Sequence, residues 1–464
     1  MSLRVATAGL ELMADALRAQ GLDPVAVEWR PPAGGEPADI ATLAALYGDP
    51  RVERANAEAL ARLRAARPVL AGAGQAGDRI PGMDEGRVIL HAGPAIAPER
   101  MCAPQRIAAA GACVLEGWAD DLEAASRLIG EGAVTLAPAH SRMAAGAMTG
   151  IISPSVAVWE ARDPETGVAC FAPFCDGPGD AFWLGVGSDE AIARQRLMAD
   201  VLAPAFDAAL AAEGPLEVFP LLAEGLAMGD DCHMRHQATT MLLARRLLPA
   251  MAERAPAAVA PLARMLAGNG HFALTVTIAA CRVALEGIRG IEASTITTFV
   301  SRNGTDAAVQ IAGLPDEWFL APAEMVGDAL YRPGVGDEDA APDIGDSALV
   351  ECCGLGGAAS AASPSVAAFL GGTLADAVER TRMMGDICAG TSEVFRMPLL
   401  DGEPTPLGVD ARACVDLGQT PLINTGILHC EDGGQIGAGV AKTPVAPFRD
   451  ALWALARGLG EAQG

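Results

Sequence analysis

Short apolar runs and amphipathic stretches alternate through residues 1–85, which is typical of a small α/β unit. Short apolar runs predict strands, and apolar positions spaced by three or four residues predict helices. The pattern predicts a strand at 4–8, a helix at 10–18, a strand at 24–29, helices at 38–47 and 50–66, and a strand at 68–71. We therefore take residues 1–85 as an N-terminal α/β unit.

A glycine-rich stretch, Gly72-Ala-Gly-Gln-Ala-Gly77, follows the last of these strands with the spacing of a dinucleotide-binding loop. Such a loop must open a helix, because the pyrophosphate binds at the helix N-terminus. Here Pro81 and Gly82 interrupt any helix within a few residues. The stretch therefore predicts a turn.

Residues 86–188 have the pattern of an α+β domain, and residues 189–290 form a mainly helical segment. In the domain, strands are expected at 88–90, 134–136, 156–161 and 168–174, and helices at 104–117 and 119–129. In the helical segment, Ser188 is a suitable N-cap, Pro204 is expected to kink or end the first helix, and Pro249 to end a later one. A helix at 272–285 is apolar nearly all round and should be buried.

Residues 291–464 return to an α/β pattern. Alternating segments at 295–301 and 307–311 flank Asn303-Gly304, a strong hairpin signal. Further strands are expected at 347–352 and 422–425, and the last helix at about 445–458. The expected fold class is α/β in the mixed α+β sense, multidomain, with N-terminal and C-terminal α/β units around a central helical segment.

Charge narrows the possible functions, because a net charge of -25 argues against non-specific binding to nucleic acid or to an anionic membrane. Lys442 is the only lysine, which excludes a Gly-Lys-Ser/Thr phosphate loop. An anionic substrate must therefore be bound by local arginines or helix N-termini. The 11 cysteines include no C-x-x-C pair, and we find no signal peptide and no apolar run that could span a bilayer. A cytoplasmic location is expected.

The densest cluster of candidate chemistry is Met228-Gly-Asp-Asp-Cys-His-Met-Arg-His236, directly before an apolar helical pattern. In one interpretation Asp230 or Asp231 simply caps that helix. In another, His233 and His236 lie on one helix face and ligate a divalent metal together with an aspartate. A third ligand is not identifiable, so no cofactor is expected and a metal is the minor alternative.

Other candidates lie at the ends of elements. All six histidines do so, at positions 91, 140, 233, 236, 271 and 429. Arg302 could reach an anion from the tip of the hairpin, and Gly354–Gly357 is either a phosphate cradle or a site of close packing. Acids at Asp343, Asp346 and Glu351 could orient a base or bind a cation. Spacing alone assigns no catalytic set.

Eleven signature segments, taken in order, resemble the YlbE/YahG-like family, long classed as a domain of unknown function, which includes the AllG subunit of oxamate carbamoyltransferase. The resemblance covers essentially the full chain. The segments are Val27–Gly35, Ile80–Asp84, His91–Pro94, Gly111–Trp118, Gly150–Ser155, Met228–Asp230 with His233 and Arg235, Arg302–Gly304, Asp343–Ser347, Gly354–Gly357, Asn424–Gly426 with His429, and Gly434–Gly439.

The resemblance implies a subunit that works with an FdrA-like subunit, which has succinyl-CoA-synthetase-like domains, and one further subunit. Such a complex exchanges a carbamoyl group between oxalurate, or a related ureido acid, and phosphate, giving oxamate and carbamoyl phosphate in anaerobic allantoin use. This chain departs from the family pattern at His236, more often Asn, at Asp231, more often Glu, and over Phe174–Gly187. A homo-oligomer is also expected.

Chemistry placed on the matching motifs gives the expected site, because transfer passes through a tetrahedral centre with developing negative charge. The expected catalytic residues are His233, His140, His429 and Asp230. The expected anion-binding or substrate-binding residues are Arg235, Arg302, Asn303, Gly304, Asn424, Thr425, His91, Gly356, Gly357 and Gln435. Two rival hypotheses are a non-catalytic scaffold or substrate-sensing subunit and a metal-dependent amide hydrolase.

Overall fold

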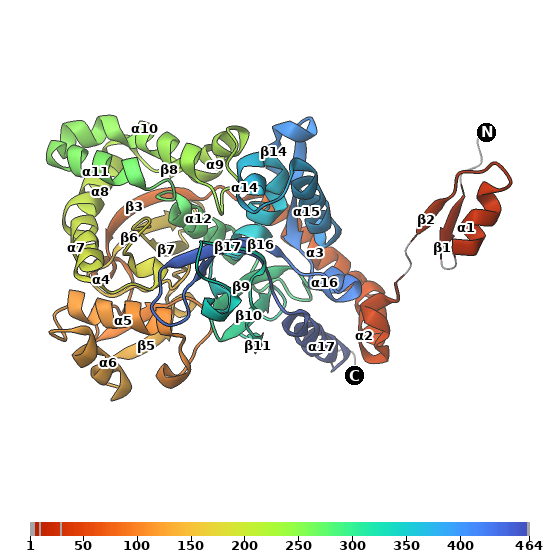
Figure 1. The fold of residues 1–464 in the computed structure, drawn as a ribbon, viewed down its shortest axis with the longest axis horizontal. Coiled ribbons are helices and arrows are strands. Elements are labelled where there is room, and N and C mark those ends of the chain that lie inside the picture. The colour runs from red at the N-terminus through yellow and green to blue at the C-terminus, as the bar shows by residue number, and fades with distance from the viewer. Residues whose placement is uncertain (1–4, 9–10, 28–29, 462–464) are drawn as a thin grey trace.

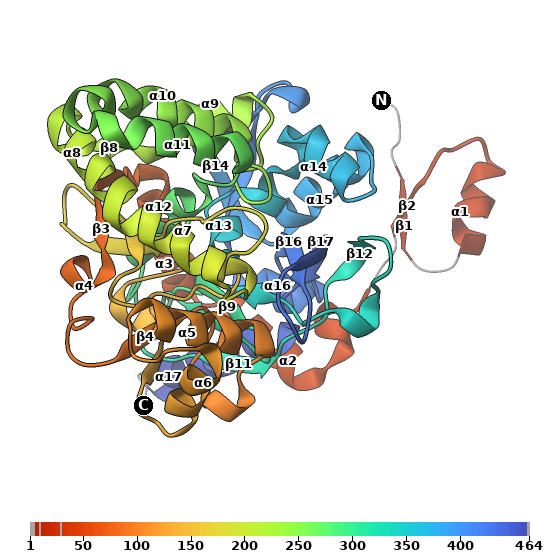
Figure 2. The ribbon, with the colours of Figure 1, turned by 60° about the vertical axis from the view of Figure 1, so that its left-hand side comes forward.

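The computed structural model of the chain describes residues 5–8, 11–27 and 30–461. Within these ranges helices surround several small sheets, and the mixed α/β fold class is confirmed. A small unit at the N-terminus, which ends at β2 (Val25–Val27) and is shorter than the predicted unit of residues 1–85, stands apart from the main body. The later elements pack into the main body (Figures 1 and 2). No helix in these ranges is long and apolar enough to cross a bilayer.

The N-terminal unit has the expected order of strand, helix and strand, and its two strands pair in parallel. It consists of β1 (Ala6–Ala8), α1 (Glu11–Arg18) and β2 (Val25–Val27). Residues 4 and 28–29 of the expected strands lie outside the described residues. The next two helices, α2 (Pro37–Tyr47) and α3 (Pro50–Ala65), also form where expected, but they pack against elements from the C-terminal part of the chain.

A four-stranded antiparallel sheet in the order β7-β6-β3-β8 lies in the main body. Gly72 and Gly74 lie inside β3, so the predicted turn is wrong. A Cβ at Gly74 would lie 2.6 Å from Nε of Arg79, so the bare strand leaves room for the Arg79 side chain, which bonds to Asp207 at 2.7 Å. The elements are β3 (Val69–Gln75), α4 (Ala76–Arg79), β6 (Ala157–Arg162), β7 (Ala169–Pro173) and β8 (Leu216–Glu217).

A two-stranded parallel sheet with two helices forms beside it, close to the positions expected from the sequence. Its elements are β4 (Val88–His91), α5 (Ala103–Leu115), α6 (Leu122–Gly130) and β5 (Thr135–Pro138). The carboxyl end of β4 delivers His91 to the interior.

The helical segment forms as expected, with one correction. Pro249 lies inside α10 and does not end it, because Leu247, Ala250 and Met251 on either side are buried and hold the helix through the missing hydrogen bond. At Pro204, one π turn at residues 198–202 directly precedes the start of α8. The predicted burial of the 272–285 helix is confirmed. The helices are α7 (Asp189–Leu197), α8 (Ala203–Glu213), α9 (Val218–Ala227), α10 (Gln237–Arg254), α11 (Pro256–Gly268) and α12 (Leu274–Glu286).

The strands of the C-terminal part form three further sheets. The predicted hairpin at Asn303-Gly304 is confirmed, since β9 and β10 pair antiparallel on either side of it. Most of the glycine-rich signature segment Gly434–Gly439 belongs to a strand, which begins at Gln435 and ends at the exposed Lys442. The strands are β9 (Thr297–Asn303), β10 (Asp306–Ile311), β11 (Phe319–Pro322), β12 (Gly327–Tyr331), β13 (Ile344–Gly345), β14 (Cys388–Met397), β15 (Glu403–Val409), β16 (Leu422–Leu428) and β17 (Gln435–Lys442).

The strand predicted at 347–352 is wrong, because Leu349–Cys352 forms a short buried helix, α13. A short apolar run has the same pattern in a buried helix as in a buried strand, so periodicity could not separate them. A 3₁₀ helix at Gly356–Ala362 follows. The remaining helices are α14 (Pro364–Phe369), α15 (Leu374–Asp386), α16 (Ala411–Leu417) and α17 (Val445–Glu461).

Candidate functional site

The Met228–His236 cluster folds as a compact loop between α9 and α10. The prediction that His233 and His236 share a helix face is wrong, because the helix begins only at Gln237. His236 is buried, with Nε2 3.2 Å from the hydroxyl of Thr277. Within the described ranges, no three His, Cys, Asp or Glu side chains are grouped to hold a metal ion.

Asp230 caps the helix that follows the loop. Its buried carboxylate accepts the backbone N–H of Thr239 at 2.7 Å and that of Ala238 at 3.2 Å, and it also pairs with the guanidinium of Arg235. These bonds satisfy N–H groups that a helix start leaves without partners. The interpretation of Asp230 as a cap therefore fits its geometry.

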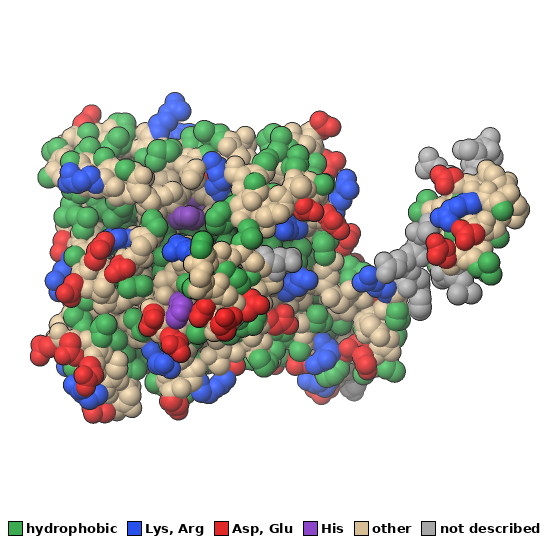
Figure 3. All heavy atoms as spheres, viewed as in Figure 1, with side chains coloured by type: hydrophobic (Ala, Val, Ile, Leu, Met, Phe, Trp, Pro, Cys, Tyr) green, Lys and Arg blue, Asp and Glu red, His purple; other side chains and the backbone are tan. Residues whose placement is uncertain are grey.

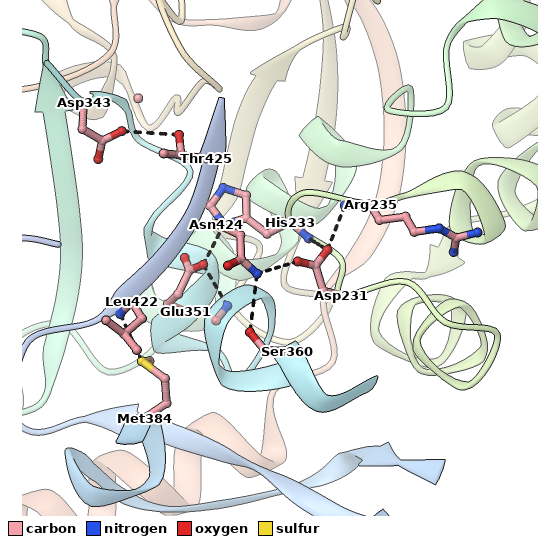
Figure 4. A network of polar contacts seen from close by, with 12 residues as sticks. Asp231, His233, Arg235, Asp343, Glu351, Ser360, Met384, Leu422, Asn424 and Thr425 are labelled. Atoms are coloured by element: carbon pink, nitrogen blue, oxygen red, sulfur yellow. Dashed lines mark hydrogen bonds and ion pairs between the residues drawn. The ribbon is translucent and has the colours of Figure 1, made fainter. Parts of the chain in front are cut away.

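Asp231 ties the loop to strand β16 (Figure 4). Its carboxylate accepts the backbone N–H of His233 at 3.1 Å and that of Arg235 at 2.8 Å. The same group accepts the side-chain amide of Asn424 in β16 at 3.0 Å. The loop conformation and the position of β16 are thus fixed by one buried carboxylate.

His233 forms a buried pair with Glu351 of α13. Nδ1 of His233 lies 2.7 Å from Oε1 of Glu351, and both side chains are at most 5% exposed. Gly356 packs directly on the pair, since a Cβ there would lie 2.2 Å from the same carboxylate oxygen. Gly357 donates its backbone N–H to that oxygen at 3.2 Å. The Gly356-Gly357 segment therefore has the close-packing role that was one of its two interpretations.

Burial and charge act in opposite directions on His233. Burial alone would lower its pKa, but the Glu351 carboxylate at hydrogen-bond distance outweighs burial and raises the pKa above the ordinary value. Burial also raises the pKa of Glu351. The two groups interact at hydrogen-bond distance, so the pair titrates as a unit.

Two adjoining cavities meet at the loop. The inner chamber, of about 70 Å³, includes His233, Ser347, Asn424 and Thr425 in its wall, and the outer cavity, of about 360 Å³, includes Arg235. Met234, His271 and Gln435 line both. Nε2 of His233 has no hydrogen-bond partner among the described residues, so it is the ring nitrogen open to the chamber.

The segment Phe174–Gly187, which departs from the family pattern, contributes Pro178, Trp183 and Leu184 to the inner chamber. Trp183 is fixed by its indole N–H, which donates to the carbonyl of Gly177 at 2.6 Å. Figure 3 shows acidic side chains spread over the face of the molecule drawn there. A largely apolar wall on one side and polar groups on the other suit a small polar ligand.

Three of the predicted histidines lie elsewhere. His140 stacks on Trp318 with ring centroids 4.0 Å apart, and burial, helped by Arg282, lowers its pKa to about 3. Nδ1 of His429 accepts backbone N–H groups of the turn between β16 and β17. His91 is buried, with Nδ1 2.8 Å from the carbonyl of Ala92. None of the three lines either cavity.

Arg302 does not reach out from the hairpin tip, so that prediction is wrong. Its side chain is 2% exposed, with Nε 2.6 Å from Asp343 and Nη1 2.6 Å from the carbonyl of Gly345. Asp343 in turn accepts the hydroxyl of Thr425 at 3.3 Å, which links Arg302 to the chamber wall. Asn303 and Gly304 form the hairpin turn itself, with the Asn303 side chain accepting N–H of Asp306 at 2.7 Å.

Of the predicted site residues, those that line the two cavities are His233, Arg235, Asn424, Thr425 and Gln435. Sequence reasoning omitted His271, Met234, Trp183 and Ser347 from the site. For His271 a signal existed, since Asn269-Gly270 places it at the end of an element, but its position beside the other residues depends on the tertiary fold.

Comparisons with known proteins agree with one another. A family model described as "Oxamate carbamoyltransferase subunit AllG" matches residues 134–347. The chain is 33% identical over 97% of its length to the Escherichia coli "Uncharacterized protein YahG", of which it covers 96%. It is 36% identical over 88% of its length to the E. coli "Oxamate carbamoyltransferase subunit AllG", of which it covers 99%.

A solved structure has the same fold. It is the crystal structure of a conserved protein of unknown function from Enterococcus faecalis V583, with a TM-score of 0.85 and 34% sequence identity. The match covers 89% of this chain and 99% of that chain.

Proposed function

This chain belongs to the YlbE/YahG-like family that includes AllG, as its motifs indicated, and from that premise we propose that it is a subunit of a carbamoyltransferase complex. The proposed reaction exchanges a carbamoyl group between oxalurate, or a related small ureido acid, and phosphate. Its products are oxamate and carbamoyl phosphate. The name of the AllG relative, an oxamate carbamoyltransferase subunit, supports this reaction class.

The observation that supports a site is the His233–Glu351 pair on the wall of the inner chamber. Nδ1 of His233 is occupied by Glu351, so the ring presents Nε2 to the chamber. The Glu351 carboxylate raises the pKa of His233, which favours the protonated ring. An imidazolium with this geometry is a general acid.

In the proposed step an oxygen of phosphate attacks the terminal carbamoyl carbon of oxalurate. A C–O bond forms, the C–N bond to the oxamate portion breaks, and the proton lost by the phosphate hydroxyl ends on the leaving nitrogen. His233 gives its Nε2 proton to that nitrogen and takes one from the phosphate. Arg235, in the outer cavity, stabilises the anionic groups.

The partners in this proposal are an FdrA-like subunit and one further subunit. The AllG relative is named as a subunit, which supports an assembly of more than one kind of chain. We place the complex in the cytoplasm, with this chain as a homo-oligomer within it and no bound cofactor. The residues proposed to act in this chain are His233, Glu351 and Arg235.

The test is turnover of the reconstituted complex with His233→Asn. Asn keeps an N–H donor near the position of Nδ1, and hence the bond to Glu351, but has no atom in place of Nε2. We expect kcat to fall by about 100-fold or more, as is usual for a lost general acid, with a smaller change in KM. The measurement is formation of carbamoyl phosphate from oxalurate and phosphate, and an unchanged kcat contradicts the role of His233.

A second candidate function is a substrate-binding subunit whose chemistry lies on a partner. The observation that favours it is that Arg235 is already paired with Asp230, which leaves less positive charge for catalysis. Calorimetric titration of the full chain with carbamoyl phosphate and with oxamate separates the two. Binding by the chain together with a normal kcat for His233→Asn favours the binding subunit.

A further inference from the structure

The short segment between α11 and α12 carries His271 to the junction of the two cavities and is held from both sides. Asn269 donates its side-chain amide to the carbonyl of Cys175 at 2.7 Å and accepts the backbone N–H of His271 at 3.0 Å. The next residue, Phe272, is 1% exposed and packs in a cluster of buried aromatic rings. The backbone of His271 is therefore fixed before any ligand binds.

The direction of one hydrogen bond determines the tautomer of His271. Nε2 lies 2.8 Å from the backbone carbonyl of Met234. A carbonyl oxygen only accepts, so Nε2 carries the proton and Nδ1 carries a lone pair. Burial lowers the pKa of His271, which keeps the ring neutral and the lone pair present.

Nδ1 of His271 has no hydrogen-bond partner among the described residues, although the side chain lines both cavities. Its surroundings also include Trp183, with ring centroids 5.9 Å apart, and Leu274, both in the wall of the inner chamber. Nδ1 is not among the buried polar atoms that lack a partner, so it can be reached from the cavities, and a ligand N–H can take the place of water on its lone pair.

We propose that Nδ1 of His271 accepts an N–H of the nitrogen that becomes the amide of oxamate and so selects amides over carboxylates. This inference rests on the proposed function and names the atom that distinguishes its substrates. An amide NH₂ offers the donor that the lone pair needs, whereas a carboxylate oxygen offers only a second lone pair. His271 is a specificity residue in this proposal, and His233 on the same chamber gives the same nitrogen its second proton when the C–N bond breaks.

Oxamate and oxalate are the matched probes, since they have the same size and differ by NH₂ in place of one carboxylate oxygen with its negative charge. Calorimetry on the full chain measures the ratio of their dissociation constants. We expect the wild-type chain to bind oxamate about tenfold or more tightly than oxalate, the size of one well-placed hydrogen bond. We expect His271→Phe, which keeps a flat ring without the lone pair, to bring this ratio close to one.

The matched control is Thr240→Val. The Thr240 hydroxyl accepts the N–H of Ala273 at 3.2 Å and donates to the carbonyl of Gly270 at 3.2 Å, so its loss loosens the same segment while His271 keeps its lone pair. We expect both ligands to weaken by similar factors and the ratio to stay at the wild-type value. A purely structural role for His271 predicts that His271→Phe behaves in the same way.

The wild-type measurement alone can overturn the inference. A ratio near one, a preference for oxalate, or no binding of either probe by the wild-type chain does so, as does an unchanged ratio in His271→Phe. The turnover assay of the reconstituted complex decides the proposed function separately. A complex that forms carbamoyl phosphate with the same ligand ratio in His271→Phe leaves that function standing and removes only the role of His271.

Discussion

His233 and His140 are both largely buried, yet their surroundings act on them in opposite ways. His233 faces the carboxylate of Glu351 at 2.7 Å, which raises its pKa against the effect of burial. His140 lies between Trp318 and Phe299, and burial together with the nearby Arg282 lowers its pKa to about 3. The first is paired with a carboxylate and opens onto a cavity, while the second is a neutral part of an aromatic cluster.

The difference shows that the neighbour, and not the residue type, decides what a buried histidine can do. The two residues look alike in the sequence, since both end a structural element. Glu351 is 118 residues from His233, so the charge that separates the two cases arrives only with the tertiary fold. Changing the neighbour should therefore convert one case into the other.

The largest effect is expected from Glu351→Gln, which removes the charge but keeps a side chain of the same shape. Burial, the largest effect on His233, is then opposed only by the weaker effect of Asp231 and lowers its pKa, so the imidazolium is lost at lower pH than in the wild-type chain. We expect turnover of the reconstituted complex at pH 7 to fall by about 100-fold, and the alkaline limb of the pH–rate profile to move to lower pH. A profile that keeps its alkaline limb contradicts the pairing as the source of the raised pKa.

A smaller effect is expected from Gly356→Ala, which leaves both members of the pair in place. The new Cβ would lie 2.2 Å from Oε1 of Glu351 and 2.9 Å from Cβ of His233, so the two side chains must shift. We expect about tenfold lower turnover and a loss of about 2 kcal/mol in the free energy of unfolding.

Gly418→Ala is the matched control for that variant. Gly418 has φ +61°, close to the +58° of Gly356, but a Cβ there meets nothing within 4 Å. It should cost only the left-handed backbone conformation, about 1 kcal/mol, with normal turnover. Equal losses of turnover in the two variants would show that the contact with the pair is unimportant.

The smallest effect is expected from His140→Phe and concerns stability alone. The folded pKa of His140, about 3, lies below the ordinary 6.5, so the unfolded chain binds the extra proton between these values. Stability contributed by the neutral ring is present above pH 6.5 and is lost as pH falls, by up to about 1.4 kcal/mol per pH unit. Denaturant unfolding between pH 7 and 5 should be less pH-dependent in His140→Phe, and equal slopes contradict the lowered pKa.

His233 contributes the opposite slope. Its folded pKa is raised, so the stability it contributes is present below its ordinary pKa and is lost as pH rises through the folded value. The two histidines therefore contribute opposite slopes to the pH dependence of stability.

Much of the secondary structure was predictable from the sequence because local signals agreed with the fold. Asn303-Gly304 formed the expected hairpin, and the uniformly apolar 272–285 segment became the buried helix α12. Failures came where packing overrode local preference, as at Pro249, or where a short apolar run was ambiguous, as at Leu349–Cys352. Gly72 and Gly74 were predicted to form a turn, because nothing in the strand itself indicates that Arg79, on the next element, packs against them.

The site was predictable in part. Glu351 was one of several acids that could orient a base or bind a cation, and His233, Arg235 and Asn424 were expected in the site, but nothing local indicated that Glu351 pairs with His233. Arg302 looked like a free cation because its partner, Asp343, is distant in the sequence. The role we propose for His271 depends on a hydrogen bond to the carbonyl of Met234, and such a bond leaves no trace in residue identity.

Lys442, the only lysine, lies exposed at the end of β17 and lines neither cavity. Carbamoyl phosphate releases cyanate, an electrophile that modifies unprotonated amines, whereas a guanidinium with a pKa above 12 has no lone pair to offer. A chain that binds its anions with arginine alone therefore presents this reagent with a single side-chain amine. Under the proposed function, the near absence of lysine therefore limits modification of the chain by cyanate released from carbamoyl phosphate.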